Sequence, residues 1–358
     1  MRRVLFLGML LLLLTGRAFG AEELLDAGEA ERALPETAAE LMEGRSEKDP
    51  GDLSSGILQI ISRAAERSGG AVRTGMALCC QILAVVILTA VVRGTGGSLS
   101  GRAVSLAGAL AVGGICAGRI SGFFSQAADT VDAMAAFSGF LFSGLATLTA
   151  ATGAAGTSGT LYGVTVLICG ILTRAAQRLI VPGTACYMAL SVADSAVEGG
   201  TLKPAADLLR QGMTSLMKFG VLGFTAYLSL TGVVGGSVDS AAVKAAKLTI
   251  SSAVPVVGSM VADASETLLV SASVLRGGLG VFGLLGVLAV SVLPFLETGC
   301  QYLMLKLTAA AAGAAGEKEL SALIGAMAGA MGLLTGLVGA CAAVLMVACV
   351  CFMKVSVI

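Results

Sequence analysis

The stretch that decides the fold class is residues 133–173, AMAAFSGFLFSGLATLTAATGAAGTSGTLYGVTVLICGILT, which holds no charged side chain. A second uncharged stretch covers 320–353. A water-soluble core does not use apolar runs of this length, whereas a helix that crosses a bilayer needs about 20 such residues. Hydrophobic residues make up 56% of the chain and charged residues only 13%, against roughly 25% charged in soluble domains. The sequence therefore predicts an all-α, polytopic helical membrane protein.

Isolated charged residues bracket the individual spans. The long stretch 133–173 is expected to divide in two at the Gly, Ser and Thr cluster of 152–159. The segment Leu179–Ala193 carries Pro182, so it is either a kinked crossing or a re-entrant piece. The other expected crossings are 74–92, 103–118, 219–238, 277–296, 300–316 and 331–353. We expect seven or eight transmembrane helices, within a range of six to nine.

The first 72 residues have a different character. Two arginines precede the apolar run Val4–Leu14 and small residues precede Ala21, which is typical of a signal peptide; an uncleaved anchor is the alternative. Residues 21–52 hold eleven acidic against three basic side chains. Apolar residues at helical spacing over 53–68 indicate an amphipathic helix on the membrane surface. The expected organisation is a signal peptide at 1–20, an acidic exoplasmic arm with an amphipathic helix at 21–72, and a polytopic helical membrane domain at 73–358.

Two polar stretches between spans also have a helical pattern. In 204–218, Asp207, Gln211, Thr214 and Lys218 share one face and Leu208, Leu209, Met213 and Leu216 share the other. In 238–251, two lysines and two serines likewise share a face. Both stretches are expected to form interfacial helices that join spans.

Composition excludes most catalytic classes. The chain has no histidine, which removes most zinc sites and all Ser–His or Cys–His pairs. The cysteines lie mainly in apolar runs, where they behave as small hydrophobic residues. There is no basic face interleaved with aromatic residues. We therefore expect no enzyme activity, no cofactor, no metal and no nucleic acid partner.

Glycines four residues apart let helix backbones approach closely in lipid. The pairs Gly325/Gly329, just before the last expected span, and Gly332/Gly336, within it, are the candidates for helix packing. The string Gly278-x-Gly280-x-x-Gly283 matches a dinucleotide-binding motif, but it opens an apolar span and follows no strand. Helix packing is the better interpretation of these glycines too.

The segment 248–262 is apolar but short, and a Pro-Val-Val-Gly sequence interrupts it. Interrupted helices at membrane depth are tolerated only against protein or a wet cavity, and in transporters they mark the substrate path. One hypothesis is that this segment lines or gates a polar passage; the alternative is a Pro-kinked interfacial loop. The candidate residues are Lys244, Lys247, Pro255, Gly258, Asp263 and Glu266.

Two further charges, Glu297 and Lys306, flank the segment around residue 300. Charges within membrane segments are often functional, although long side chains also extend to the interface from a span end. Arg174 and Arg178 lie one helical turn apart beside a span end, an arrangement typical of lipid-headgroup anchors.

From about residue 130 onward the sequence resembles the stage III sporulation protein AE family of endospore-forming bacteria. The most specific part is 239–267, with Lys244-Ala-Ala-Lys247, the Val-Pro-Val-Val-Gly run ending at Gly258, and Asp263. Leu293-Pro294 and the run Tyr302–Ala309 also fit the family. The first 130 residues match only in layout.

The resemblance implies a multi-pass subunit of the secretion or feeding channel complex between mother cell and forespore, a conduit or scaffold in the mother-cell membrane around the forespore. Implied partners are other membrane and ring-forming subunits of that complex and a secretion-type ATPase, together with membrane lipid; a homo-oligomer is left open. No enzyme activity is implied. The alternative function is a stand-alone secondary transporter or permease for a small solute.

Overall fold

A computed structural model of the chain describes residues 32–43, 52–95, 98–151, 155–196, 201–224 and 258–354. These residues are almost all helical, without a strand among them, which confirms the all-α fold class. The helices are α3 (Glu36–Leu41), α4 (Leu53–Arg67), α5 (Gly69–Thr95), α6 (Ser98–Ala151), α7 (Ala155–Ala175), the π-helix η1 (Ala176–Ile180), α8 (Val181–Ala196), an unlabelled helix at 203–224, α10 (Gly258–Ala314) and α11 (Lys318–Lys354).

Five segments of the described chain are long and apolar enough to cross a membrane. They are Gly69–Thr95, Ala103–Leu148, Gly163–Ser195, Gly277–Ala314 and Lys318–Val350. This number is smaller than the seven or eight expected because three pairs of predicted spans are joined into single long segments. The predicted span at 219–238 lies mostly outside the described residues, and so does the signal peptide at 1–20.

The expectation of separate crossings at 103–118 and 133–151 is wrong. Helix α6 continues through both without a break and is 54 residues long, which corresponds to about 80 Å. The connecting residues 119–132 carry charges but no proline. Charge sets whether a side chain prefers lipid or water, but it does not interrupt backbone hydrogen bonding as proline does. The break expected at 152–159 does occur, since α6 ends at Ala151 and α7 begins at Ala155.

The segment Leu179–Ala193 is also not a separate crossing, because it continues α7 through η1 into α8. Proline at position 182 lacks an N–H and its ring crowds the carbonyl four residues earlier, at Arg178. Arg178 lies within η1. A π-helical turn is wider than an α-helical turn and carries a different hydrogen-bond pattern. This local widening lets the helix pass the proline without ending.

The predicted spans 277–296 and 300–316 likewise belong to one helix. Helix α10 has 57 residues and contains Pro294 in its interior. It reverses into α11 through a short turn in which Gly316 has a φ of 87°. That left-handed conformation is the one glycine adopts readily at the end of a helix.

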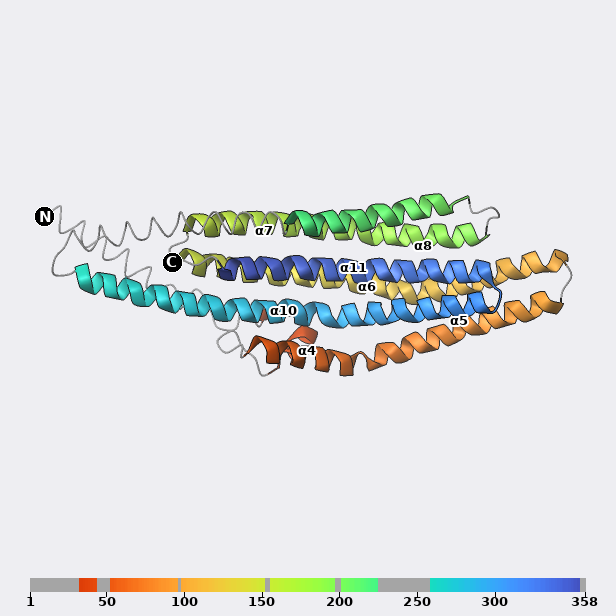
Figure 1. The fold of residues 1–358 in the computed structure, drawn as a ribbon, viewed down its shortest axis with the longest axis horizontal. Coiled ribbons are helices and arrows are strands. Elements are labelled where there is room, and N and C mark those ends of the chain that lie inside the picture. Colours follow the sequence, from red (N-terminus) through yellow and green to blue (C-terminus); the bar gives the residue numbers. More distant parts are fainter. Residues whose placement is uncertain are drawn as a thin grey trace.

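Helices α6, α10 and α11 run side by side along the long axis of the molecule (Figure 1). The most apolar windows of α10 and α11 are 61% and 56% buried, against 28% for α5 and 22% for the segment through α7 and α8. Helices α10 and α11 therefore form the centre of the bundle. The outer helices expose large apolar side chains such as Leu88 and Leu167.

Two glycines of α10 bring that helix against α6. A Cβ atom at Gly283 would lie 2.5 Å from Cδ2 of Leu141, and a Cβ at Gly286 would overlap the ring of Phe137. Phe137 and Leu141 are both fully buried. A side chain at either position would require Leu141 or Phe137 to shift.

The predicted amphipathic helix is present as α4. Asp52 caps its N-terminus by accepting a hydrogen bond from the backbone N–H of Ser55. Ile60 and Ala64 are buried, whereas Leu58 points outward. Arg63 donates hydrogen bonds to backbone carbonyls near the end of α3, so the two short helices are tied together.

The helix predicted at 204–218 is also present. Ala206 and Met213 are buried against α8 and α11, together with the partly buried Leu209 and Met217. Leu208 and Leu216, which share the predicted apolar face with Met213, are exposed. The second predicted interfacial helix, 238–251, lies outside the described residues.

Candidate functional site: a polar belt across an apolar bundle

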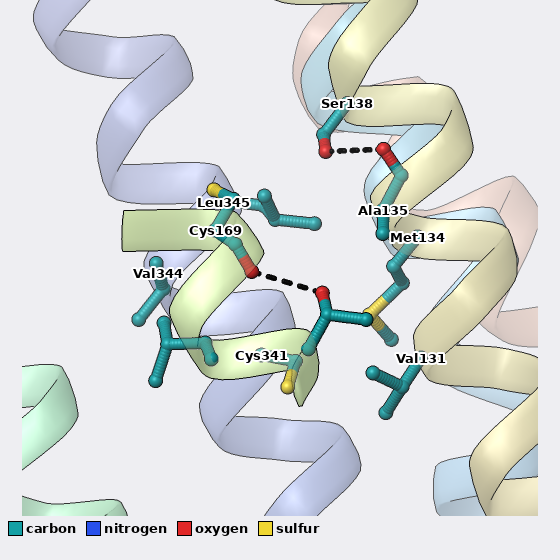
Figure 2. A pocket seen from close by; sticks show the side chains of 10 residues that line it. Val131, Met134, Ala135, Ser138, Cys169, Cys341, Val344 and Leu345 are labelled. Carbon is teal, nitrogen blue, oxygen red and sulfur yellow. Dashed lines mark hydrogen bonds between the residues drawn. The ribbon is translucent and has the colours of Figure 1, made fainter. Parts of the chain in front are cut away.

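A small cleft lies between α6, α7 and α11 (Figure 2). It is lined by Val131, Met134, Ala135, Ser138, Cys169, Leu172, Thr173, Cys341, Val344 and Leu345. The two hydroxyl groups are engaged within their own helices. Ser138 donates to the carbonyl of Ala135 and Thr173 to that of Cys169, each at 2.9 Å. The cleft offers an apolar wall and no charged group, so we assign no chemistry to it.

The polar side chains of the bundle gather at a different place, between its two apolar ends. We call this set the polar belt. It consists of Gln126, Asp129 and Asp132 of α6, Arg174 of α7, Gln177 and Arg178 of η1, and Glu297 and Gln301 of α10.

One contact of the polar belt joins α6 to α10. Gln126 donates a hydrogen bond through Nε2 to the carboxylate of Glu297, and both side chains are partly buried. Glu297 therefore points into the bundle, which is the first of the two alternatives considered from the sequence. Lys306 is exposed. A charged carboxylate within an apolar bundle is costly unless it is hydrogen-bonded. The amide of Gln126 supplies that bond.

A second contact joins α6 to η1. Gln177 donates through Nε2 to the carboxylate of Asp132. Ser125 donates to Asp129 at 3.3 Å along α6. Asp129, Asp132, Arg174 and Arg178 are all exposed. The belt thus has a hydrogen-bonded inner part and an outer rim of both charge signs.

Gln301 lies one helical turn after Glu297 and is 3% exposed. Its side chain packs against Gly75 of α5, where a Cβ would come within 2.7 Å of the Gln301 Oε1 atom. Its Nε2 atom is buried and makes no hydrogen bond within the described residues. An unpaired buried amide donor costs about 1–3 kcal/mol.

A second polar cluster lies at the turn between α10 and α11. Arg93 of α5 pairs with Glu317 at 2.8 Å, and the Glu317 side chain is 5% exposed. Ser105 of α6 donates to the carboxylate of Glu319. The two contacts fix the α5 and α6 ends to the α10–α11 turn.

The residues proposed for a polar passage are only partly described. Lys244, Lys247 and Pro255 lie outside the described residues. Gly258 is the first residue of α10, and Asp263 and Glu266 follow in its first turns. The passage hypothesis stays a prediction.

The four glycines proposed for helix packing all lie in α11 but differ in surroundings. A Cβ at Gly329 would come within 2.9 Å of the Tyr187 hydroxyl, and one at Gly332 within 3.2 Å of the Tyr302 ring. A Cβ at Gly336 would meet Met217 at an ordinary 3.8 Å, and one at Gly325 would meet nothing within 4 Å.

Reasoning from the sequence missed Gln126, Asp129, Asp132, Gln177 and Gln301. The available signal was their position, since each is a polar residue close to the edge of an apolar stretch. Their pairing carries no sequence signal, because Gln126 and Glu297 are 171 positions apart. In the described part of the chain, no three His, Cys, Asp or Glu residues come together in a way that could hold a metal ion.

Comparison with known proteins adds one match. A family model described as Stage III sporulation protein AE (spore_III_AE) matches residues 36–358. No curated protein and no solved structure matches the chain. The matched range covers all the helices described above.

Proposed function

Because the chain belongs to the Stage III sporulation protein AE family, we propose that it is a multi-pass membrane subunit of the sporulation-specific channel complex between mother cell and forespore. In this role it is a conduit or scaffold in the mother-cell membrane that surrounds the forespore. Its partners are the other membrane and ring-forming subunits of the complex and a secretion-type ATPase. The single observation that carries the proposal is the family match over 36–358.

The architecture supports a structural role in a membrane assembly. The described chain is an apolar helical bundle with five candidate spans. The cleft between α6, α7 and α11 is apolar, the partly buried Glu297 accepts a hydrogen bond from Gln126, and the buried Glu317 pairs with Arg93. These groups hold helices together, and an assembly subunit needs such contacts.

Deleting the gene tests this role. We expect normal vegetative growth, normal engulfment and then arrested forespores, with heat-resistant spores restored when the wild-type gene is supplied at a second locus. The physical reason is that a complex lacking its large membrane subunit cannot connect the two cells. Counting heat-resistant spores and imaging the membranes of sporulating cells measure the outcome. A normal spore yield in the deletion strain rejects the proposed function.

A further inference from the structure

The bundle is longer than one bilayer is thick. Helices α6 and α10 have 54 and 57 residues, which correspond to about 80 and 85 Å at 1.5 Å per residue. The hydrocarbon core of a bilayer measures about 30 Å. These helices run side by side with α11 (Figure 1). Transmembrane helices tilt by up to about 40°, which would still leave about 60 Å along the membrane normal. Part of the bundle must lie outside the hydrocarbon.

On one side of the polar belt, three helices present uncharged segments of matching length. These segments are 133–151 of α6, 155–173 of α7 and 277–296 of α10, while α11 is uncharged over all of 320–353. The three segments are about 28–30 Å long at 1.5 Å per residue. The polar belt residues Asp132, Arg174 and Glu297 stand at their inner ends.

On the other side of the belt, the surface is also largely apolar but carries charges. Leu88 of α5, Leu110 of α6 and Leu307 of α10 are all more than half exposed. Arg210 lies beside Gly329 of α11 and is exposed, as is Lys306. This side of the belt therefore also exposes apolar surface that favours contact with lipid.

The rim of the polar belt separates the two halves. It exposes two carboxylates, Asp129 and Asp132, and two guanidinium groups, Arg174 and Arg178. A charged side chain at the centre of a bilayer costs about 2.5–3.5 kcal/mol or more, whereas at the level of the headgroups both signs find water, phosphate or ammonium partners. Four exposed charges at one level are therefore stable at a membrane boundary and costly in the hydrocarbon.

From this arrangement we propose that the polar belt is the membrane-boundary site of the protein: lipid headgroups contact its rim, and only one half of the bundle lies in the hydrocarbon. Arg174 and Arg178 bind the headgroup phosphates, and the hydrogen bonds from Gln126 to Glu297 and from Gln177 to Asp132 hold α6, α10 and η1 in register at that level. The proposal concerns the protein in its membrane and does not depend on the channel function.

The chain has no tryptophan, so one introduced tryptophan reports its own surroundings. We would place it at Arg178 in the belt rim, at Leu167 in the uncharged half, and at Leu307 and Leu88 in the other half, each in the full chain in nanodiscs of phosphatidylcholine and phosphatidylglycerol. All four side chains are exposed, so the substitutions leave the packing intact. Lipids brominated near the headgroup or deep in the acyl chain, and aqueous iodide, are the quenchers. Asp129→Trp is the second belt variant should Arg178→Trp fail to fold.

The expected result is that Arg178→Trp loses fluorescence to shallow bromine and to iodide, with little loss to deep bromine. Deep bromine is expected to quench the tryptophan on one side of the belt only. It quenches either Leu167→Trp or the pair Leu307→Trp and Leu88→Trp, and not both. Strong quenching of the belt position by deep bromine overturns the proposal. So does deep-bromine quenching on both sides of the belt. Belt positions that no quencher reaches also overturn it, because protein would then cover the rim.

Discussion

Replacing Gly286 by leucine is expected to lower the free energy of unfolding by about 3 kcal/mol or more, because inserting atoms into a packed core typically costs 1–3 kcal/mol and here the obstacle is an aromatic ring. A Cβ at this position already overlaps the ring of Phe137, which is fully buried. Because Phe137 is fully buried, the leucine fits only if the ring shifts within a packed core. Unfolding of the purified protein by SDS in mixed micelles measures the change.

The matched control is Gly277→Leu in the same helix, where a Cβ would meet nothing within 4 Å. Its effect is expected to stay within about 0.5 kcal/mol, as for most surface substitutions. The double variant Gly286→Leu/Phe137→Ala should recover part of the loss, because the smaller residue on α6 leaves room for the leucine. Equal effects of Gly286→Leu and Gly277→Leu would show that α6 and α10 do not pack in this register.

Replacing Arg93 by leucine is expected to cost about 1–2 kcal/mol of unfolding free energy, less than the 3–5 kcal/mol for breaking a fully buried ion pair, because one partner is solvated. The Arg93 side chain is 41% exposed, while that of Glu317 is only 5% exposed. Removing the arginine leaves the carboxylate in the α10–α11 turn without its cation. The turn and the end of α5 should then separate more easily.

A double-mutant cycle with Glu317→Gln distinguishes the ion pair from lost packing of the arginine side chain. On the Glu317→Gln background, Arg93→Leu is expected to cost less than about 0.5 kcal/mol, because the partner charge is already gone. Both steps are measured by SDS unfolding at low salt. Additive losses across the cycle would mean that the two side chains do not interact.

The sequence alone predicted the helical class, the apolar segments and the end of α6. The break after Ala151 was predictable because a cluster of small and polar residues separates two apolar runs there. The continuity of α6 through Asp129 and Asp132 was not, because hydropathy reports the solvent a segment prefers and not whether its backbone hydrogen bonds continue. The same confusion produced a false boundary at Glu297, inside α10.

The polar belt shows a second limit of sequence reasoning. Glu297 could be identified as an unusual charge, since it interrupts an apolar run. Its partner Gln126 could not, because any of several polar residues on other helices could have met it. The helix at 203–224 shows the same limit. Leu208 and Met213 are both apolar, and only the position of α8 and α11 decides that Met213 is buried and Leu208 is exposed.

The central claim is that this chain is built into lipid, because uncharged helical stretches such as 133–151 and 277–296 are more stable in lipid than in water. Alkaline carbonate extraction of membranes from cells that produce the protein tests that claim most directly. Carbonate strips peripheral proteins from membranes and leaves integral ones. The account predicts that the whole protein stays in the membrane pellet and enters solution only with detergent. Recovery of the protein in the carbonate supernatant as a compact, monodisperse particle would contradict it.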